Sequence, residues 1–279
     1  MAIDTHTHFY EPNRPQGVPW PPSDNELLYR TVLPPHLKTL AEPVGITGTV
    51  VVEASPWVDD NQWILDLAEK EPYIVGFVGN LDPDSDTFDA NLDRLSENPI
   101  FRGIRIGRGH LQGGALARSG VRRLADNDLS LDILAGPDQL SLVADLARKL
   151  PDLRIVLNHV AHVPIDGLTP DAAWIDGLHA VAEFPQVYCK VSGMVEMAKK
   201  SPAPAEMAYY APTMDHLWEI LGEDRLIYGS NWPVCERAAD YATVYRIAQE
   251  YFASIGSEAL KKVLYSNPTL AYGIRERTG

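Results

Sequence analysis

The chain begins with the run AIDTHTH (residues 2–8), which carries two histidines, His6 and His8, separated by one residue. Seven further runs are of strand length, rich in Val and Ile, and bounded by Pro, Gly, Asn or Asp, as β-strands are. We therefore expect eight strands, the first of which ends on the histidine pair. The other seven runs are GTVVVEA (48–54), YIVGFVG (73–79), FRGIRI (101–106), LSLDILA (129–135), LRIVLNHV (153–160), QVYCKVS (186–192) and RLIYGSN (225–231).

The segments between these runs have helical periodicity, and no change of composition along the chain marks a linker. The segment GPDQLSLVADLARKL (136–150) has Pro137 in its first helical turn and apolar residues in helical register. In the segment 169–184, Thr169 is the expected helix cap, with a proline after it. Alternating strands and helices predict a (β/α)₈ TIM barrel, an α/β fold, as a single domain over residues 1–279. A doubly wound open sheet is the alternative.

The first connection between a strand and a helix is long and rich in proline. In a barrel, residues 9–35 form this first βα loop. Loops at this end of a barrel surround the site, so we expect Trp20 and Tyr29 of the loop to cover it.

The composition limits the class of protein. Hydrophobic residues make up 45% of the 279 residues, and the net charge of −14 repels nucleic acid and anionic membranes. No apolar run approaches the ~20 residues of a membrane span, and the N-terminus lacks the pattern of a secretion signal. Cys189 and Cys235 are too few for a disulfide framework. We expect a cytoplasmic protein with a small-molecule partner and with neither nucleic acid nor a membrane as partner; a homo-oligomer stays open.

Ionisable side chains gather at the carboxyl ends of the predicted strands, where TIM barrels carry their chemistry. His6 and His8 face the same way, because alternate residues on a strand share a face, and two such imidazoles can bind one divalent cation. Burying ionisable groups without partners is costly, so their convergence at one rim indicates an active site. The other groups at this rim are Glu53, Arg105, Asp132, His159, Lys190 and Asn231.

Several of these residues also have a purely structural interpretation. Glu53 and Arg105 could form an internal ion pair between strands, and Lys190 could be a solvated strand end. Trp57 and Trp232 fit packing at the rim as well as they fit platforms for a substrate.

Motifs that follow one another along nearly the whole chain resemble those of the amidohydrolase superfamily. Within it, they are similar to the branch of small TIM-barrel lactonases, which includes sugar-acid lactonases and 2-pyrone-4,6-dicarboxylate lactonase. The resemblance implies a TIM-barrel hydrolase that opens lactones. The motifs are IDTHTHFYEP (3–12), FRGIRIG (101–107), LNHVAHVP (157–164), VYCKVSG (187–193), RLIYGSNWPV (225–234) and NPTLAYG (267–273).

The resemblance also implies roles for individual residues. His6 and His8 match the metal-binding pair of the first strand, and His159 matches the later histidine of the site. Arg105 matches an arginine that holds the carboxylate or hydroxyls of the substrate. Asn231 falls where the superfamily usually has an aspartate that binds metal and takes a proton from the attacking water.

The chain departs from the superfamily pattern in two ways. The fourth predicted strand has no lysine of the kind that becomes carboxylated and bridges two metals, so the resemblance implies one metal ion or none. The amide of Asn231 does not take a proton near neutral pH. Glu53 is our preferred replacement, either as a metal ligand beside His6 and His8 or as the base itself.

These considerations predict hydrolysis of a lactone, with a sugar-acid lactone as the first choice. A single divalent ion, zinc in preference to manganese, would polarise the ester carbonyl or lower the pKa of bound water toward ~7. Glu53 or His159 would deprotonate the water. The expected metal ligands are His6, His8, Glu53 and His159.

Other residues would bind the substrate. Arg105 and Lys190 would hold its polar groups or the developing oxyanion, and Trp57 and Trp232 would shape the pocket. Three other functions stay open: a non-oxidative decarboxylase of the same superfamily, an isomerase of sugar lactones, and a barrel that has lost catalysis and only binds a sugar acid. Lactonase activity without a metal is a further alternative.

Overall fold

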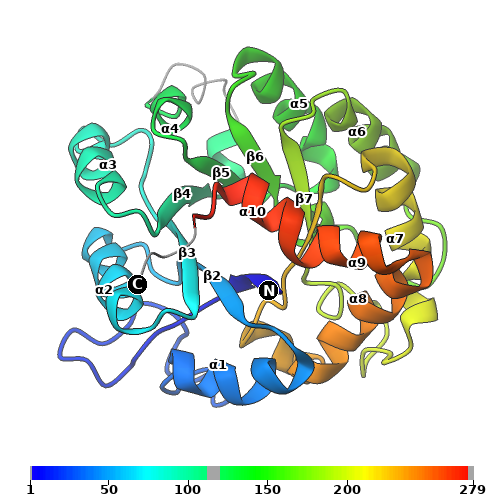
Figure 1. Ribbon diagram of the computed structural model, residues 1–279, viewed down its shortest axis with the longest axis horizontal. Helices are drawn as coiled ribbons and strands as arrows, with labels where there is room; N and C mark the ends of the chain where they lie inside the picture. The colour runs from blue at the N-terminus through cyan, green and yellow to red at the C-terminus, as the bar shows by residue number, and fades with distance from the viewer. Residues whose placement is uncertain (1, 112–119, 276–279) are drawn as a thin grey trace.

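Each run that the sequence predicts to be a strand contains a strand of one parallel sheet in the computed structural model, which describes residues 2–111 and 120–275 (Figure 1). The strands follow one another round the sheet in chain order. A doubly wound sheet reverses its strand order at a switch point, so the predicted barrel is confirmed. The strands are β1 (Ile3–Thr7), β2 (Gly48–Val52), β3 (Ile74–Gly79), β4 (Phe101–Ile106), β5 (Ser130–Ile133), β6 (Arg154–Leu157), β7 (Val187–Val191) and β8 (Leu226–Tyr228).

Backbone hydrogen bonds join the first strand to the segment after the last one. The amide of Asn231 donates to the carbonyl of His6 (2.8 Å), and the amide of His8 donates to the carbonyl of Trp232 (2.9 Å). Thr7 and Trp232 also form a parallel bridge. This closure holds the histidine pair of β1 beside Asn231.

Helices cover the outside of the sheet (Figure 1). The predicted helix over residues 136–150 is α5, preceded by a 3₁₀ turn over Pro137–Gln139. The α-helices are α1 (Pro34–Ala41), α2 (Val58–Lys70), α3 (Phe88–Ser96), α4 (Arg122–Asp126), α5 (Leu140–Lys149), α6 (Ala172–Ala182), α7 (Met207–Leu221), α8 (Tyr241–Ile255), α9 (Ser257–Lys261) and α10 (Asn267–Tyr272).

The predicted cap of α6 is wrong by two residues. The helix begins after Asp171 and not after Thr169, because the Asp171 carboxylate accepts a hydrogen bond from the Ala173 amide (2.8 Å). A carboxylate at this position accepts a hydrogen bond from a backbone N–H that has no partner within the helix. Its negative charge also interacts favourably with the positive end of the helix dipole.

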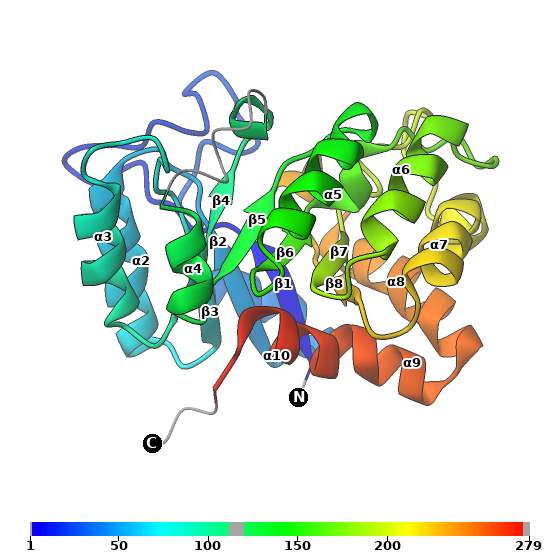
Figure 2. The same ribbon diagram turned by 90° about the horizontal axis from the view of Figure 1, so that it is seen from above.

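A mainly aliphatic cluster fills part of the barrel interior, and the amino-terminal end of the barrel is covered by α10 (Figure 2). Arg102 Nη1 donates to the carbonyl of Gly273 (3.0 Å), and Arg154 Nε donates to that of Ala271 (3.1 Å). These bonds fix α10 as the floor of the barrel, so the opposite end is the one open to a substrate. The buried interior side chains are Ile3, Val50, Val52, Val78, Val156, Ile227, Ala271 and Tyr272.

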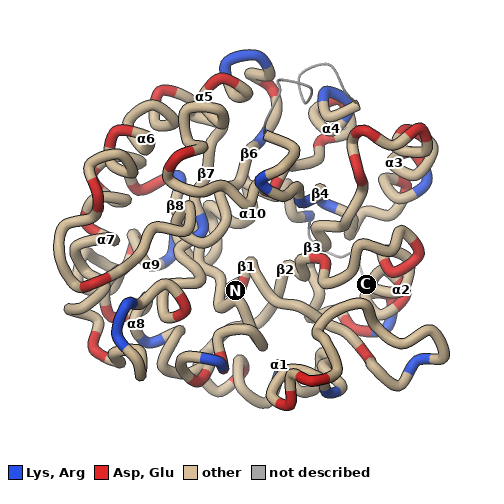
Figure 3. Tube along the Cα trace, turned by 180° about the vertical axis from the view of Figure 1, so that it is seen from behind, with Lys and Arg blue, Asp and Glu red and all other residues tan. Residues whose placement is uncertain are grey.

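Residues 8–33 connect β1 to α1 and form the long first loop that the sequence predicts. Backbone hydrogen bonds in both directions between Tyr10 and Val32, each 2.9 Å, hold its two ends together. Acidic residues are spread over the helices around the barrel (Figure 3). Among the described residues, no helix has the length and apolar character needed to cross a membrane.

A buried ion pair lies inside the barrel. The Lys190 ammonium, fully buried on β7, lies 2.7 Å from a carboxylate oxygen of Asp132 on β5. The Asp132 carboxylate also accepts from the Tyr272 hydroxyl (3.1 Å) and from the Asn158 amide (2.8 Å). Lys190 Nζ lies 3.1 Å from His6 Nδ1. Lys190 is therefore not a solvated strand end.

We predict that Asp132→Ala lowers the free energy of unfolding by about 3–5 kcal/mol, because it leaves the Lys190 charge buried without its partner. Urea unfolding followed by circular dichroism measures the change. The matched control is the double variant Asp132→Leu with Lys190→Met, which removes both charges and should cost less than the single variant. A single variant as stable as the wild type would contradict the prediction.

Candidate active site

A cavity of about 670 Å³ lies at the carboxyl end of the strands. Its polar lining comes from almost every strand end, so the barrel brings together residues that are far apart in the sequence. Trp20 of the first loop also lines it, as predicted, whereas Tyr29 is not among the lining residues. The ionisable and amide side chains of the lining are His8, Glu53, Asn80, Arg105, His159, His162, Glu196, Asn231 and Arg237.

Two of the predicted histidines, His8 and His159, line this cavity, and the third, His6, is buried behind them in contact with both rings. The ring centroid of His6 lies 5.0 Å from that of His8 and 4.4 Å from that of His159. All three side chains are buried. β1 supplies His6, the residue after β1 is His8, and His159 follows β6, so closure of the barrel is what assembles the cluster.

Each of these rings is held through its δ nitrogen. His8 Nδ1 lies 2.9 Å from the carbonyl of Val52, and His159 Nδ1 lies 2.9 Å from the hydroxyl of Ser192. His6 Nδ1 faces the Lys190 ammonium described above. The ε nitrogens are left for other partners: within the described part of the chain, buried His6 Nε2 has no hydrogen bond.

Burial keeps the three imidazoles neutral. It lowers the pKa of His8 to about 3, with the Arg105 charge acting in the same direction. Burial also lowers the pKa values of His6 and His159 well below the ordinary value of 6.5, assisted by Lys190 for His6 and by His162 for His159. Neutral imidazole is the form that binds a metal ion.

The turn that carries His159 has an unusual backbone. Residues 159–162 all have positive φ, between 46° and 53°, and the second of them is a buried valine. A β-branched residue in the left-handed region is strained, and such strain is found mainly at functional sites. The Trp174 indole, which donates to the Val160 carbonyl (2.9 Å), helps to hold the turn and with it the His159 ring.

Glu53 and Arg105 form the ion pair that was the structural alternative. Arg105 Nη2 lies 2.7 Å from Glu53 Oε1, Nε lies 2.8 Å from the same oxygen, and Nη2 also donates to the Glu53 carbonyl (2.9 Å). Both residues line the cavity. The Glu53 carboxylate is thus engaged by a guanidinium and not by the histidines.

Asn231 connects the histidines to a residue that the sequence analysis did not select. Its amide nitrogen donates to Glu196 Oε1 (2.6 Å), while its amide oxygen lies 3.4 Å from His8 Nε2. Burial raises the pKa of Glu196 to about 7. Glu196 lies in the apolar run MVEM (194–197) just after β7, and a lone carboxylate in such a run is the signal that could have found it.

Three predicted substrate-binding residues lie away from the cavity lining. Lys190 is fully buried below it. Trp57 immediately precedes α2 and is 39% exposed, and Trp232 is buried against Phe9 with its indole donating to Glu236 (2.7 Å). Arg105 is the predicted substrate-binding residue that reaches the cavity.

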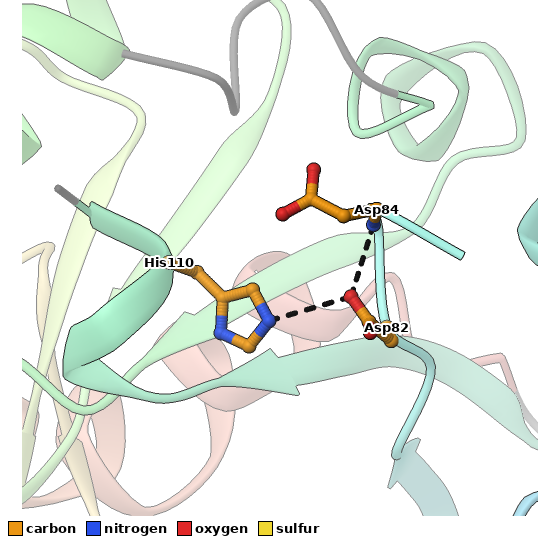
Figure 4. Close-up of side chains that lie close together, drawn as sticks. All are labelled: Asp82, Asp84 and His110. Atoms are coloured by element: carbon orange, nitrogen blue, oxygen red, sulfur yellow. Dashed lines mark hydrogen bonds and ion pairs between the residues drawn. The ribbon is translucent and has the colours of Figure 1, made fainter. Parts of the chain in front are cut away.

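A second group of possible metal ligands lies at the rim (Figure 4). Within the described ranges, Asp82, Asp84 and His110 are the only set of three or more His, Cys, Asp or Glu side chains whose ligand atoms all lie within 4.8 Å of one another. His110 Nε2 lies 3.5 Å from Asp82 Oδ1. Both carboxylates are exposed and none of the three lines the cavity, so we assign no chemistry to this group.

Comparisons with known proteins identify the family of this chain. The family model described as "Amidohydrolase" matches residues 3–274. L-fucono-1,5-lactonase of Burkholderia ambifaria is 31% identical over 246 residues, covering 86% of this chain and 83% of that protein. L-fucono-1,5-lactonase of Burkholderia multivorans is 28% identical, covering 95% and 93%. A crystal structure of an amidohydrolase from Burkholderia multivorans with bound zinc has a TM-score of 0.85 at 26% identity, covering 99% of this chain and 100% of that one. The resemblance carried by the sequence motifs is confirmed.

Gly193 allows the close approach of His159. It has φ +64°, and a Cβ added there would lie 2.9 Å from His159 Cβ. We predict that Gly193→Ala lowers the free energy of unfolding by about 1–3 kcal/mol, through backbone strain and displacement of the histidine. Urea unfolding measures the loss. The control is Gly222→Ala, where φ is +78° but no atom lies within 4 Å of the added Cβ. Equal losses at both positions would show that the contact with His159 is unimportant.

Proposed function

Because this chain belongs to the amidohydrolase family and is a hydrolase, we propose that it opens the ring of a sugar-acid lactone by attack of water on the ester carbonyl. The observation that carries the proposal is a polar cavity lined by the neutral imidazoles of His8 and His159 and by Arg105, with the His6 ring packed behind the two histidines. The names of two relatives, both L-fucono-1,5-lactonases, support a sugar acid as the acyl part.

We propose that the histidine cluster holds a single divalent cation, with zinc as the first choice, and that its rings move together on binding, since their ligand nitrogens do not all lie within 4.8 Å of one another. His8 Nδ1 donates to the Val52 carbonyl and the ring is neutral, so the ε nitrogen of His8 carries a lone pair. His159 would offer the same atom when its Nδ1 donates to the Ser192 hydroxyl, and His6 Nε2 is buried with no hydrogen bond in the described part of the chain. When bound to these three residues, the cation supplies positive charge that polarises the ester carbonyl.

Arg105 would hold the substrate. Its guanidinium lines the cavity and is fixed by two hydrogen bonds to the Glu53 carboxylate and carbonyl. A guanidinium fixed in this way can bind a carboxylate or the developing oxyanion without first losing side-chain freedom. We propose that Glu53 positions Arg105, and that Trp20 packs against the substrate from the first loop.

We predict that the purified protein hydrolyses at least one lactone in a panel of five- and six-membered sugar-acid lactones, because the site combines neutral imidazoles with a fixed guanidinium. Acid release measured with a pH indicator follows the reaction. Pre-treatment with a chelator should abolish the activity, and added zinc should restore it. Elemental analysis of protein purified without added metal identifies the resident ion.

The same experiment distinguishes the other functions. Loss of the lactone without acid release indicates an isomerase, and release of carbon dioxide from aromatic acids indicates a decarboxylase. Binding of sugar acids without turnover of any lactone indicates a barrel that has lost catalysis. Full activity in protein shown to be free of metal would contradict the role proposed for the cation.

Arg105→Lys is predicted to lower kcat/KM for the lactone by about 10²–10³-fold, because a lysine keeps the charge but loses the fixed guanidinium. Steady-state kinetics measure the effect. Arg148→Lys, on the exposed face of α5, is the matched control and should leave kcat/KM unchanged. An unchanged kcat/KM in Arg105→Lys would rule out contact of Arg105 with the transition state.

A further inference from the structure

The proposed reaction needs a group that takes a proton from water, and Asn231, three residues after the end of β8, cannot supply it. An amide does not accept a proton near neutral pH. Two carboxylates line the cavity among the described residues, Glu53 and Glu196. Glu53 is held in its ion pair with Arg105. Its Oε1 already accepts from Nε and Nη2 of the Arg105 guanidinium, so this carboxylate is engaged in positioning Arg105.

Glu196 has a different environment. Its Oε1 accepts the hydrogen bond from the Asn231 amide (2.6 Å). Its Oε2 is buried and has no hydrogen-bond partner in the described part of the chain. The positive charge of Arg237 acts on the Glu196 carboxylate and lowers its pKa, but less than burial raises it. One oxygen of Glu196 is thus anchored, and the other is available to a water or substrate oxygen.

We propose that Glu196 is the general base of the hydrolysis and returns the proton as general acid, an inference that rests on the proposed lactonase function. Glu196 takes one proton from water while the water oxygen forms a bond to the carbonyl carbon. The ring C–O bond then breaks with its electron pair on the ring oxygen, and that oxygen takes the proton from Glu196. One lactone and one water give one hydroxy acid, and the carboxylate of Glu196 is regenerated.

Asn231 has a positioning role in this arrangement. Its side-chain amide donates to Glu196 Oε1, and its backbone amide donates to the His6 carbonyl (2.8 Å), so the carboxylate is fixed relative to the histidine cluster. Where the resemblance implies an aspartate, this chain has the amide of Asn231, and the carboxylate is supplied by Glu196 after β7. The amide at β8 is then a consequence of the acid at residue 196 and does not mark lost catalysis.

The electrostatic environment suits the role. Burial raises the pKa of Glu196 to about 7, and the Asn231 hydrogen bond and the Arg237 charge only partly oppose this shift. The other titratable groups that face Glu196 are Tyr210 on α7 and Cys235, and burial raises the pKa values of both. A base whose pKa lies close to the working pH is both largely ionised and strong enough to take a proton.

The test is Glu196→Gln, which keeps the shape and the contact with Asn231 but cannot take the proton. Its kcat is expected to fall by about 10²–10⁴-fold. The rise of kcat/KM with pH, which for the wild type should be centred near the Glu196 pKa of about 7, should disappear. The matched control is Glu69→Gln on the exposed face of α2, which should leave both unchanged.

An exchange variant tests the pairing itself. Glu196→Gln combined with Asn231→Asp moves the carboxylate to β8 and keeps one acid and one amide. It should recover kcat by at least about tenfold over Glu196→Gln alone. In Glu196→Ala, added formate should restore part of the rate, because a small carboxylate can occupy the space left by the side chain. A purely structural role of Glu196 would give neither recovery.

The Tm values of Glu196→Gln and of the wild type, measured against pH, show whether the variant folds and whether Glu196 titrates near pH 7 in the folded protein. The folded chain holds the Glu196 proton more tightly than the unfolded chain, so Glu196 favours folding below its ordinary pKa of 4.5. This contribution is lost as the pH rises through about 7. The Tm of the wild type should therefore fall relative to that of Glu196→Gln over this range.

The outcomes distinguish the two proposals. A wild type that hydrolyses no lactone overturns the proposed function and the assignment of Glu196 together. A wild type that hydrolyses a lactone while Glu196→Gln keeps its kcat and pH profile overturns the assignment of Glu196 alone. Loss of activity in Glu196→Gln with no recovery by the exchange variant or by formate also overturns it.

Discussion

The buried ion pair between Lys190 and Asp132 joins the floor of the barrel to its active site. Charges in so low a dielectric are tolerated only when each donor and acceptor around them is satisfied. The Asp132 carboxylate is bound by the Tyr272 hydroxyl of α10, and Lys190 in turn faces His6 Nδ1. The last helix, two interior strands and the first strand therefore fix one another, and the position of His6 follows from that constraint.

Much of the fold and part of the site could be predicted from the sequence, because they depend on local properties. Runs of Val and Ile with turn residues at their ends define the strands, and their alternation with helical segments gives the barrel. Polar residues at the ends of such runs point to the mouth. For this reason the sequence predicts that His6, His8 and His159 lie close together, as their ring contacts show.

The pairing of long polar side chains across the barrel could not be predicted from the sequence. Glu53 was expected beside the histidines, yet Arg105 on β4 binds its carboxylate. Lys190 points down to Asp132 and not up to a substrate. The partner of Glu196 is Asn231, 35 residues further along the chain, and no sequence spacing predicts that pair. These pairings depend on how the strands are arranged around the closed barrel, and the hydrophobic periodicity of the sequence carries no information about that arrangement.

The first loop, beyond His8, shapes the cavity but carries none of the residues proposed for the reaction itself. Trp20 lies edge-on to His8, with ring centroids 5.9 Å apart, although the loop that carries it has no secondary structure of its own. The proposed catalytic groups lie on strands and on the segments directly after them, whereas Trp20, which forms one wall of the cavity, lies in a surface loop. Directed evolution toward lactones of another ring size or stereochemistry can therefore begin with mutations around Trp20 and leave the reaction machinery untouched.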